Sequence, residues 1–545
     1  MEPTMKNPRF SYASITLLLA LYFSLVLNIP IYAKLAQIFS AAEQFNWGFA
    51  FSIPIFFFLA LNVIFQLFAW PYFLKPFFAV LLILSAVVSY ASYNYGTIVD
   101  RDMLINVVET NSSEAGSYVS LYSIVWISAL GILPAALLLL SPLKVEKSIS
   151  RFLGYKALSI LLSLLGIIII AALYYQNYSS VGRNNSYLKK MIIPTHFVYS
   201  AYGLVKDRYF TEPVVYQIIG ADAQQQPKTT HSRDAEKPTL VLFVLGETAR
   251  AQNYQYYGYT RDTNAYTAPY QPIFFSDVAS CGTATAVSVP CLFSNMDRHN
   301  FDRTKADNQD NVLDILQRAG VDLLWKENDG GDKGVAKNIP QKELDKTARE
   351  GRCDGSTCYD VTMLDNLDEE IANQTGNRMI FMHIIGSHGP TYFKRYPKDM
   401  AKYQPDCPRA DIENCSVEQI VNTYDNTIRY TDFVLAQLIE KLKSLQAQYN
   451  TALIYVSDHG ESLGENGLFL HGMPYSLAPD DQTQVPLLVW LSDGFARTKG
   501  VNKTCLRQTA TQPYAHSNLF HSLLGIMDVS TNAYEKAQDI FAPCR

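Results

Sequence analysis

Thr285 carries a hydroxyl in a run of small and hydroxylated residues that begins at Ser280 and contains two cysteines, Cys281 and Cys291. Such a run is typical of the start of a helix, where unpaired backbone N–H groups and the positive end of the helix dipole stabilise an oxyanion or a phosphate. A disulfide between the two cysteines would hold this loop in a reactive geometry. The alternative interpretation is an ordinary helix start with a structural crosslink. Candidate metal ligands elsewhere in the chain favour a nucleophile.

Glu247, Asp458 and His459 directly follow two apolar runs. A catalytic zinc ion takes about four nitrogen and oxygen ligands and keeps a position for the reacting group. A threonine hydroxyl beside such an ion has a lowered pKa and becomes a competent nucleophile near neutral pH. A single carboxylate after a strand is more often a helix cap, but an apolar strand that ends in Asp-His indicates a functional site. The predicted metal ligands are therefore these three residues and Thr285.

His388 and His471 lie in loops that contain glycine and form a second predicted group. Each is expected either to bind a second metal ion or to donate a hydrogen bond to a phosphoryl oxygen. Lys333 lies in a polar loop and can pair with a phosphate, although an ordinary exposed lysine is the alternative. His383 lies inside an apolar run and is expected to be a satisfied core residue, whereas His516 has no motif around it.

The elements that position these residues are short apolar runs that end in polar side chains. Fully apolar strands are typical of a parallel sheet covered by helices on both faces, and the ligand site of such a sheet gathers at the carboxyl ends of its strands. The sequence therefore predicts an α/β domain with a mostly parallel sheet flanked by helices. The runs are residues 240–245, 321–325, 379–385, 452–457 and 486–491.

The first third of the chain consists mainly of apolar stretches. Each is about as long as the 20 or so residues that cross a bilayer as a helix. The sequence therefore predicts five membrane-spanning helices, the first of them a retained anchor and not a cleaved signal peptide. The stretches are Ile15–Ala33, Trp47–Trp70, Phe77–Tyr95, Leu121–Ser141 and Leu158–Tyr175.

Basic residues indicate how these helices are oriented. Lys and Arg residues before the first stretch and between the fourth and fifth assign those segments to the cytoplasm, whereas the segment after the third stretch is acidic. Five crossings place everything after Tyr175 outside. We thus expect a transmembrane domain at 1–176, a periplasmic connector with interfacial helices at 177–236 and a periplasmic catalytic domain at 237–545. The net charge of −5 gives no indication of nucleic-acid binding.

The eight cysteines all lie at or beyond Cys281, which indicates disulfides in an oxidising compartment. A zinc ribbon is disfavoured because no paired C-x₂-C spacing occurs. Sequence proximity favours three of the pairs, and the fourth follows by elimination. The expected pairs are 281–291, 353–358, 407–415 and 505–544.

Several of these runs together resemble the lipid A phosphoethanolamine transferases, which include the mobile colistin-resistance enzymes. The resemblance covers the whole chain and implies a catalytic domain of the alkaline phosphatase/sulfatase type. Sulfatases themselves use Cys or Ser followed by x-Pro-x-Arg, which the residues after Thr285 lack, so a formylglycine sulfatase is disfavoured. The runs that carry the resemblance are Gly246–Arg250, Ser280–Ser294, Ile385–Pro390 and Asp458–Leu463.

The resemblance also implies roles for individual residues. Thr285 attacks phosphorus and carries phosphoethanolamine, and His388 and His471 bind substrate or a second zinc ion. Lys333 and Asp329 lie in the substrate loop, where the resistance enzymes have an amide in place of Asp329, and a carboxylate there would repel a phosphate. The zinc ligands implied by the resemblance are Glu247, Thr285, Asp458 and His459.

The function implied is that of a zinc-dependent enzyme of the bacterial inner membrane. It takes phosphoethanolamine from phosphatidylethanolamine in the bilayer and transfers it to a phosphate of lipid A, giving resistance to polymyxin and colistin. One firmly bound Zn²⁺, a possible second ion and a monomeric enzyme are expected. The alternatives are transfer to a core sugar of lipopolysaccharide, transfer of phosphoglycerol, and a non-catalytic membrane protein that binds metal.

Overall fold

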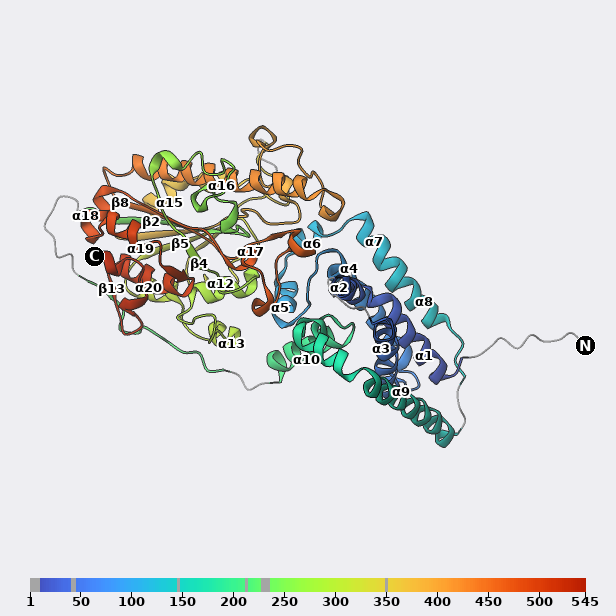
Figure 1. Ribbon diagram of the computed structural model, residues 1–545. Coiled ribbons are helices and arrows are strands. Elements are labelled where there is room, and N and C mark those ends of the chain that lie inside the picture. The colour runs from blue at the N-terminus through green and yellow to red at the C-terminus, as the bar shows by residue number, and fades with distance from the viewer. Residues whose placement is uncertain (1–9, 41–45, 145–147, 211–213, 227–235, 348–350) are drawn as a thin grey trace, which may run out of the picture. The chain divides into compact units, whose positions relative to one another are not determined.

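The structure is a computed structural model that describes residues 10–40, 46–144, 148–210, 214–226, 236–347 and 351–545. The chain forms two compact units (Figure 1). Unit 1 comprises Met1–Arg101 and Val119–Arg208, and unit 2 comprises Asp102–Tyr118 and Tyr209–Arg545. Unit 2 therefore contains a short segment that lies between two apolar stretches in the sequence.

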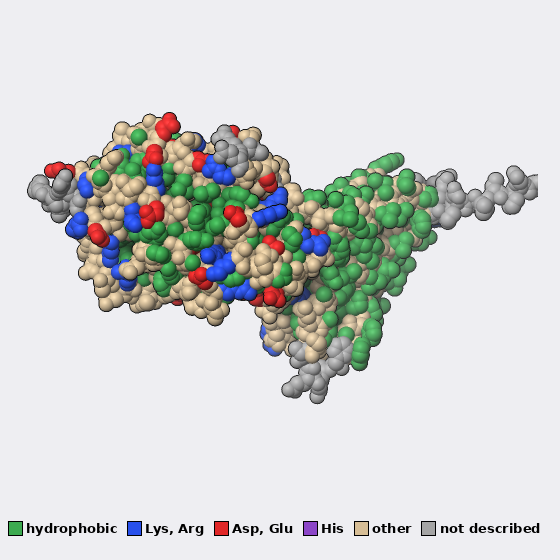
Figure 2. Space-filling view, turned by 90° about the horizontal axis from the view of Figure 1, so that it is seen from above, with side chains coloured by type: hydrophobic (Ala, Val, Ile, Leu, Met, Phe, Trp, Pro, Cys, Tyr) green, Lys and Arg blue, Asp and Glu red, His purple; other side chains and the backbone are tan. Residues whose placement is uncertain are grey.

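Unit 1 is built from apolar helices. Four of them are long and apolar enough to cross a membrane within the described residues, and a bent pair makes a fifth candidate span. Hydrophobic side chains cover the face of this unit that is visible in Figure 2, as expected of helices surrounded by lipid. The four are α3 (Trp47–Phe68), α4 (Leu74–Asn94), the helix Leu121–Leu140 and α9 (Ile149–Asn184), which is longer than predicted.

The bent pair occupies the position of the first predicted span, Ile15–Ala33. Helical residues Tyr12–Leu27 and Ile29–Ser40 meet at an angle of 51° around Asn28. Pro30, in the first turn of the second helix, has no backbone N–H to continue the helical hydrogen bonding. The buried Asn28 amide donates to the carbonyl of Ile193 (2.6 Å) and accepts from its N–H (2.9 Å). A side chain thus satisfies backbone groups that a membrane leaves without water.

Unit 2 contains a seven-stranded sheet in the order β3-β11-β8-β2-β7-β5-β6. Its strands are β2 (Thr239–Gly246), β3 (Ile273–Phe275), β5 (Asp322–Glu327), β6 (Gln341–Glu343), β7 (Arg378–His383), β8 (Asn450–Ser457) and β11 (Leu487–Leu491). The five strands from β8 to β6 are parallel, and β11 is antiparallel to both of its neighbours. The prediction of a mostly parallel sheet is confirmed.

Helices cover both faces of this sheet (Figure 1), which explains why its central strands are apolar throughout. Alternate residues of β2, among them Phe243, pack with α12 (Thr285–Phe293) and α20 (Ser517–Ile526) in one core. The long helix α16 (Val417–Ser444) lies across the other face. Ser416 caps the start of α16. The Ser416 side chain accepts the N–H of Gln419, and the Gln419 side chain accepts the N–H of Ser416.

All four predicted disulfides are present: Cys281–Cys291, Cys353–Cys358, Cys407–Cys415 and Cys505–Cys544. Each lies in unit 2, where the sequence confines every cysteine. The pairing of Cys505 with Cys544, which rested on elimination alone, joins α19 (Lys503–Thr509) to the last residues of the chain.

Candidate active site

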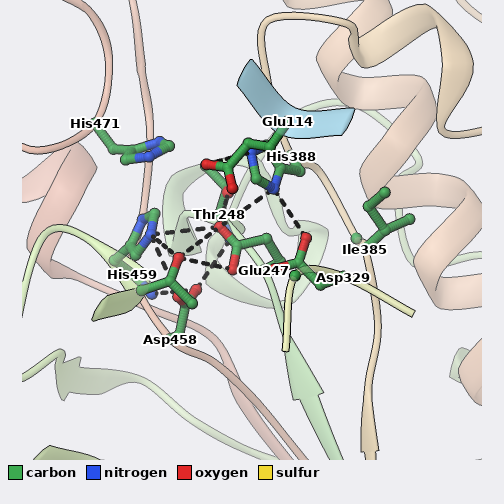
Figure 3. A network of polar contacts seen from close by, with 12 residues as sticks. Glu114, Glu247, Thr248, Asp329, Ile385, His388, Asp458, His459 and His471 are labelled. Carbon is green, nitrogen blue, oxygen red and sulfur yellow. Dashed lines mark hydrogen bonds and ion pairs between the residues drawn. The ribbon is translucent and has the colours of Figure 1, made fainter. Parts of the chain in front are cut away.

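Polar side chains gather at the carboxyl ends of four parallel strands (Figure 3). Gly246 of β2 pairs with Ser457 of β8, so the residues that come next, Glu247 and Asp458, emerge side by side. Because β7 and β5 are the next strands in the same parallel register, they bring His383 and the residues after Glu327 to the same edge. The strand register thus joins residues from distant parts of the sequence.

Thr285 is the first residue of α12 and is buried. Its Oγ1 lies 3.1 Å from Glu247 Oε2, 3.2 Å from Glu247 Oε1 and 3.3 Å from His459 Nε2. The neighbouring hydroxyls already have partners, because Thr283 donates to the carbonyl of Met473 and Ser288 donates to that of Asp458. Of these three hydroxyls, Thr285 alone contacts side-chain ligand atoms of the acidic and histidine group.

Glu247, Asp458 and His459 offer ligand atoms that all lie within 4.8 Å of one another. His459 Nδ1 lies 3.0 Å from the Gly460 carbonyl, so it carries the proton, and Nε2 presents a lone pair to the group. Asp458 Oδ1 accepts the N–H groups of Thr248 and His459. Its Oδ2, also buried, has no hydrogen-bond donor among the described residues. This carboxylate oxygen without a donor and the unprotonated imidazole nitrogen fit a divalent cation.

The charges at this group also favour a cation. Burial, Asp458 and Asp329 raise the pKa of Glu247 to about 7, and burial raises the pKa of Asp458. Burial and the neighbouring His471 lower the pKa of His459 to about 4, which keeps its imidazole neutral and able to bind metal. Crowded carboxylates in a buried site are stabilised when a cation neutralises them.

His388 and His471 border this group, and a carboxylate orients each of them. His388 Nδ1 lies 2.9 Å from Asp329 Oδ1, and His471 Nδ1 lies 2.9 Å from Glu461 Oε2. Although burial disfavours the imidazolium form, Asp329 raises the pKa of His388 and Glu461 raises that of His471. Carboxylate–histidine pairs of this kind set the orientation of the ring and the basicity of the nitrogen that faces the site.

Asp329 and Lys333 lie in the loop after β5. Together with Glu247 and His388, Asp329 forms a second group of ligand atoms within 4.8 Å of one another. Lys333 Nζ donates to the carbonyl of Gly330 (3.1 Å), and Asp329, Glu114 and Glu247 raise its pKa against the effect of burial. The sequence assigned Asp329 to substrate alone, whereas the structure gives it His388 as a partner.

The site and the fold can be compared with known proteins. A family model described as "Phosphoethanolamine transferase EptA/EptB" matches residues 57–209, and one described as "Sulfatase" matches residues 239–529. The chain is 37% identical over 547 residues to phosphoethanolamine transferase EptA of Escherichia coli (strain K12), covering 100% of this chain and 99% of that protein. This chain belongs to the phosphoethanolamine transferase family. It is also 36% identical to phosphatidylethanolamine transferase Mcr-1 of Escherichia coli, with 94% of each chain covered.

A solved structure extends the likeness to the whole fold of this transferase. The integral membrane protein lipooligosaccharide phosphoethanolamine transferase A (EptA) from Neisseria meningitidis superposes with a TM-score of 0.93 and is 35% identical, covering 99% of this chain and 100% of that one. The transferase is therefore an inner-membrane protein with a periplasmic catalytic domain of the sulfatase type. The predicted fold class and location are confirmed.

Glu114 is a site residue of the transferase that sequence reasoning missed. It lies on α6 (Ser112–Ser117), in the segment that belongs to unit 2, and its Oε1 is 3.5 Å from His388 Nε2 (Figure 3). Burial alone would raise the pKa of Glu114, but His388 outweighs burial and lowers it. In the sequence this segment is only an acidic loop, so no local signal marks Glu114. Its cavity is lined by Asn111, Glu114, Ser117, Asp329, His388 and Arg395.

His383 of the transferase is not the satisfied core residue that the sequence predicts. Its Nδ1 lies 3.0 Å from Glu327 Oε2, but its fully buried Nε2 has no hydrogen-bond partner among the described residues. That nitrogen faces Asp329 Oδ2 at 3.8 Å and Glu247 Oε2 at 3.9 Å. Burial of His383 would lower its pKa, but the Glu327 carboxylate outweighs burial and raises that pKa to about 9. His383 therefore places positive charge behind two carboxylates of the site.

Removing the Cys281–Cys291 disulfide is expected to lower activity more than stability. The bridge ties the loop before Thr285 to α12, so a Cys281→Ala/Cys291→Ala variant should lose about tenfold or more in transfer rate while remaining folded. The matched control is Cys505→Ala/Cys544→Ala. Those cysteines are separated by 39 positions, compared with 10, so their loss frees more of the unfolded chain.

Transfer rates and melting temperatures of the two variants measure this contrast. The control should lose more in melting temperature and keep its activity. If the Cys281/Cys291 variant transferred at the wild-type rate in folded protein, the bridge would have no role in positioning Thr285.

Proposed function

We propose that this transferase moves phosphoethanolamine from phosphatidylethanolamine to a phosphate of lipid A through a covalent adduct on Thr285. The observation that supports the nucleophile is the position of Thr285 Oγ1 at the first turn of α12, within 3.1–3.3 Å of Glu247 and His459. Phosphatidylethanolamine is the lipid named in the description of Mcr-1, and lipooligosaccharide is named in that of the Neisseria enzyme. A membrane enzyme suits substrates that both reside in lipid.

The ion is proposed to be Zn²⁺, because the buried donors are a mixture of carboxylate oxygen and neutral imidazole nitrogen. When bound, zinc supplies positive charge that favours the deprotonated hydroxyl and offsets charge that develops on the phosphoryl group. One ion is assigned to the first group and a second ion, or a substrate phosphate, to the neighbourhood of His388 and His471. The residues that would hold the first ion are Glu247, Thr285, Asp458 and His459.

The reaction then comprises two displacements. In the first, Thr285 Oγ1 forms a bond to phosphorus, the bond from phosphorus to the glycerol oxygen breaks, and diacylglycerol leaves with the proton. In the second, an oxygen of a monoanionic lipid A phosphate attacks phosphorus, the bond to Thr285 breaks, and the proton of that phosphate returns to Thr285 Oγ1. The unpaired N–H groups at the start of α12 are placed to stabilise the phosphoryl oxygens in both steps.

Glu114 is proposed to receive the ammonium group of the donor, because its carboxylate lines a cavity beside the reacting groups. Glu114→Gln is expected to raise the KM for phosphatidylethanolamine by about tenfold or more, since a hydrogen bond to a charged group contributes about 1.5–3 kcal/mol. Steady-state release of diacylglycerol measures this effect.

The matched control is Glu109→Gln, in the same segment, whose carboxylate pairs with Arg303 at 2.9 Å. The control should keep the wild-type KM for the donor. Equal effects in the two variants would show that the segment is merely disturbed.

The decisive experiment is mass spectrometry of lipid A from cells with and without the protein. Added phosphoethanolamine on lipid A, together with release of labelled diacylglycerol from phosphatidylethanolamine, supports the proposal. Modification of the core sugar alone, or a phosphoglycerol mass, would identify one of the related activities. Bound metal without any release of diacylglycerol would indicate a non-catalytic protein. Because the added amine offsets phosphate charge, the cells are expected to resist polymyxin and colistin.

A further inference from the structure

His516 is not one of the predicted metal ligands, but it is fully buried and contacts both Cys281, in the loop before Thr285, and Ser457, at the end of β8. It comes directly after the short strand β12 (Pro513–Ala515), which pairs in parallel with β4 (Asp277–Ala279), and its N–H donates to the carbonyl of Ala279 (3.0 Å). Ala279 comes two residues before Cys281, at the start of the loop that leads to Thr285. The backbone of His516 is thus anchored to the strand that leads to Thr285.

The imidazole of His516 joins that loop to the end of β8. Nε2 lies 2.9 Å from the carbonyl of Ser457, which only accepts, so Nε2 carries the proton. Nδ1 is consequently the acceptor for the N–H of Cys281 at 3.2 Å. Burial lowers the pKa of His516 to about 3, consistent with a neutral ring. One ring therefore bridges Cys281 and Ser457, the residue immediately before Asp458.

Ser288 makes a second connection beside the ring. Its hydroxyl donates to the carbonyl of Asp458 and lies 3.3 Å from His516 Nδ1. Ser288 is one turn beyond Thr285 on α12, so helix, loop and strand end all meet at His516. Both His516 and Ser288 are fully buried, which leaves no water to replace a lost contact readily.

We propose that His516 is a positioning residue, which sets the distance between Thr285 and the ligands Asp458 and His459. The proposal rests on the proposed function, since it assigns His516 to the geometry of that same reaction. His516 touches no reacting atom and acts through Cys281 and Ser457. A nucleophile displaced by about 1 Å loses on the order of 10²-fold in rate. The cost should therefore appear in the chemical step and not in donor binding.

Three variants at this position separate the two hydrogen bonds. His516→Leu removes both, His516→Gln retains an amide donor that reaches Ser457, and His516→Asn retains an acceptor near Cys281. His521→Gln is the matched control, because His521 is also buried, lies on α20 and makes its hydrogen bond to the N–H of Glu535 (3.1 Å), away from the site.

The measurement is single-turnover formation of the Thr285 adduct and release of diacylglycerol by full-length enzyme, with melting temperature and metal content determined for each protein. His516→Leu is expected to reduce the rate about 10²-fold with a KM for phosphatidylethanolamine within about twofold of wild type. His516→Gln and His516→Asn should each recover part of the rate, and the control should match wild type. Partial recovery is the signature that a merely structural role does not produce.

The proposal is overturned if His516→Leu reacts at the wild-type rate, or if the three His516 variants lose activity only in proportion to their folded fraction. If His516→Leu does not fold, the Gln and Asn variants decide, since wild-type rates in both would also overturn it. A wild-type enzyme that releases diacylglycerol without an adduct on Thr285 would instead refute the proposed function.

Discussion

Thr285→Ala is expected to abolish phosphoethanolamine transfer, with a loss of about 10⁴-fold or more, while the domain remains folded. The variant removes the only atom that can form the bond to phosphorus in the proposed first step, and loss of a nucleophile typically has effects of this size. The small change in volume at the helix start should cost little stability. Diacylglycerol release in the absence of an acceptor, together with the melting temperature, measures both parts of the expectation.

Thr285→Ser is the matched control because it keeps the hydroxyl and loses the methyl group that restricts its rotamer. Some activity should therefore remain. Peptide mapping after incubation with phosphatidylethanolamine should place the adduct on Thr285. The hydroxyls of the nearby Thr283 and Ser288 donate to the carbonyls of Met473 and Asp458, so we expect neither to attack phosphorus. An adduct on either of them, or an active Thr285→Ala enzyme, would identify a different nucleophile.

Asp458→Asn is expected to lower both metal content and transfer rate, the latter by about 10³-fold. A bound metal contributes several kcal/mol to the transition state, and each 1.36 kcal/mol is about tenfold in rate. The amide cannot supply the anionic oxygen that is Asp458 Oδ2 in the native protein. Asp432→Asn is a suitable control, because this buried carboxylate bonds to Asn264 and to the N–H of Tyr266, in a different network. It should lose stability and keep its metal.

Metal removal should also change how stability depends on pH. The folded pKa of Glu247, about 7, lies above its ordinary value of 4.5. A group with a raised folded pKa contributes stability below its unfolded pKa and loses that contribution as pH rises through the folded value. Chelator-treated enzyme should therefore lose melting temperature between about pH 4.5 and pH 7, whereas zinc-loaded enzyme should not. Equal pH profiles for the two forms would contradict the placement of a cation beside Glu247.

Local sequence determined the chemistry-bearing residues at strand ends, because an apolar run that stops before Glu247 or before Asp458-His459 identifies both a buried strand and the polar residues at its carboxyl end. Three of the four disulfides were predictable because their cysteines lie close together in the sequence, 10, 5 and 8 positions apart. The membrane helices were predictable from length and hydropathy alone.

The bend at Asn28 was not predictable from hydropathy, which does not record that the Asn28 amide bonds to the backbone of Ile193, 165 positions away. The antiparallel direction of β11 was not predictable either. A fully buried strand is apolar throughout whichever way it runs, so its pattern carries no information about direction.

The remaining site residues were decided by tertiary structure. Glu114, His383 and His516 come from an acidic loop, an apolar strand and a helix start, and each is ordinary within its own segment. Their significance arises because the fold brings them to His388, to Asp329 and to the carbonyl of Ser457. Sequence records a residue's type and its neighbours along the chain, but hydrogen bonds and charge interactions depend on distances in space that only the packed fold sets.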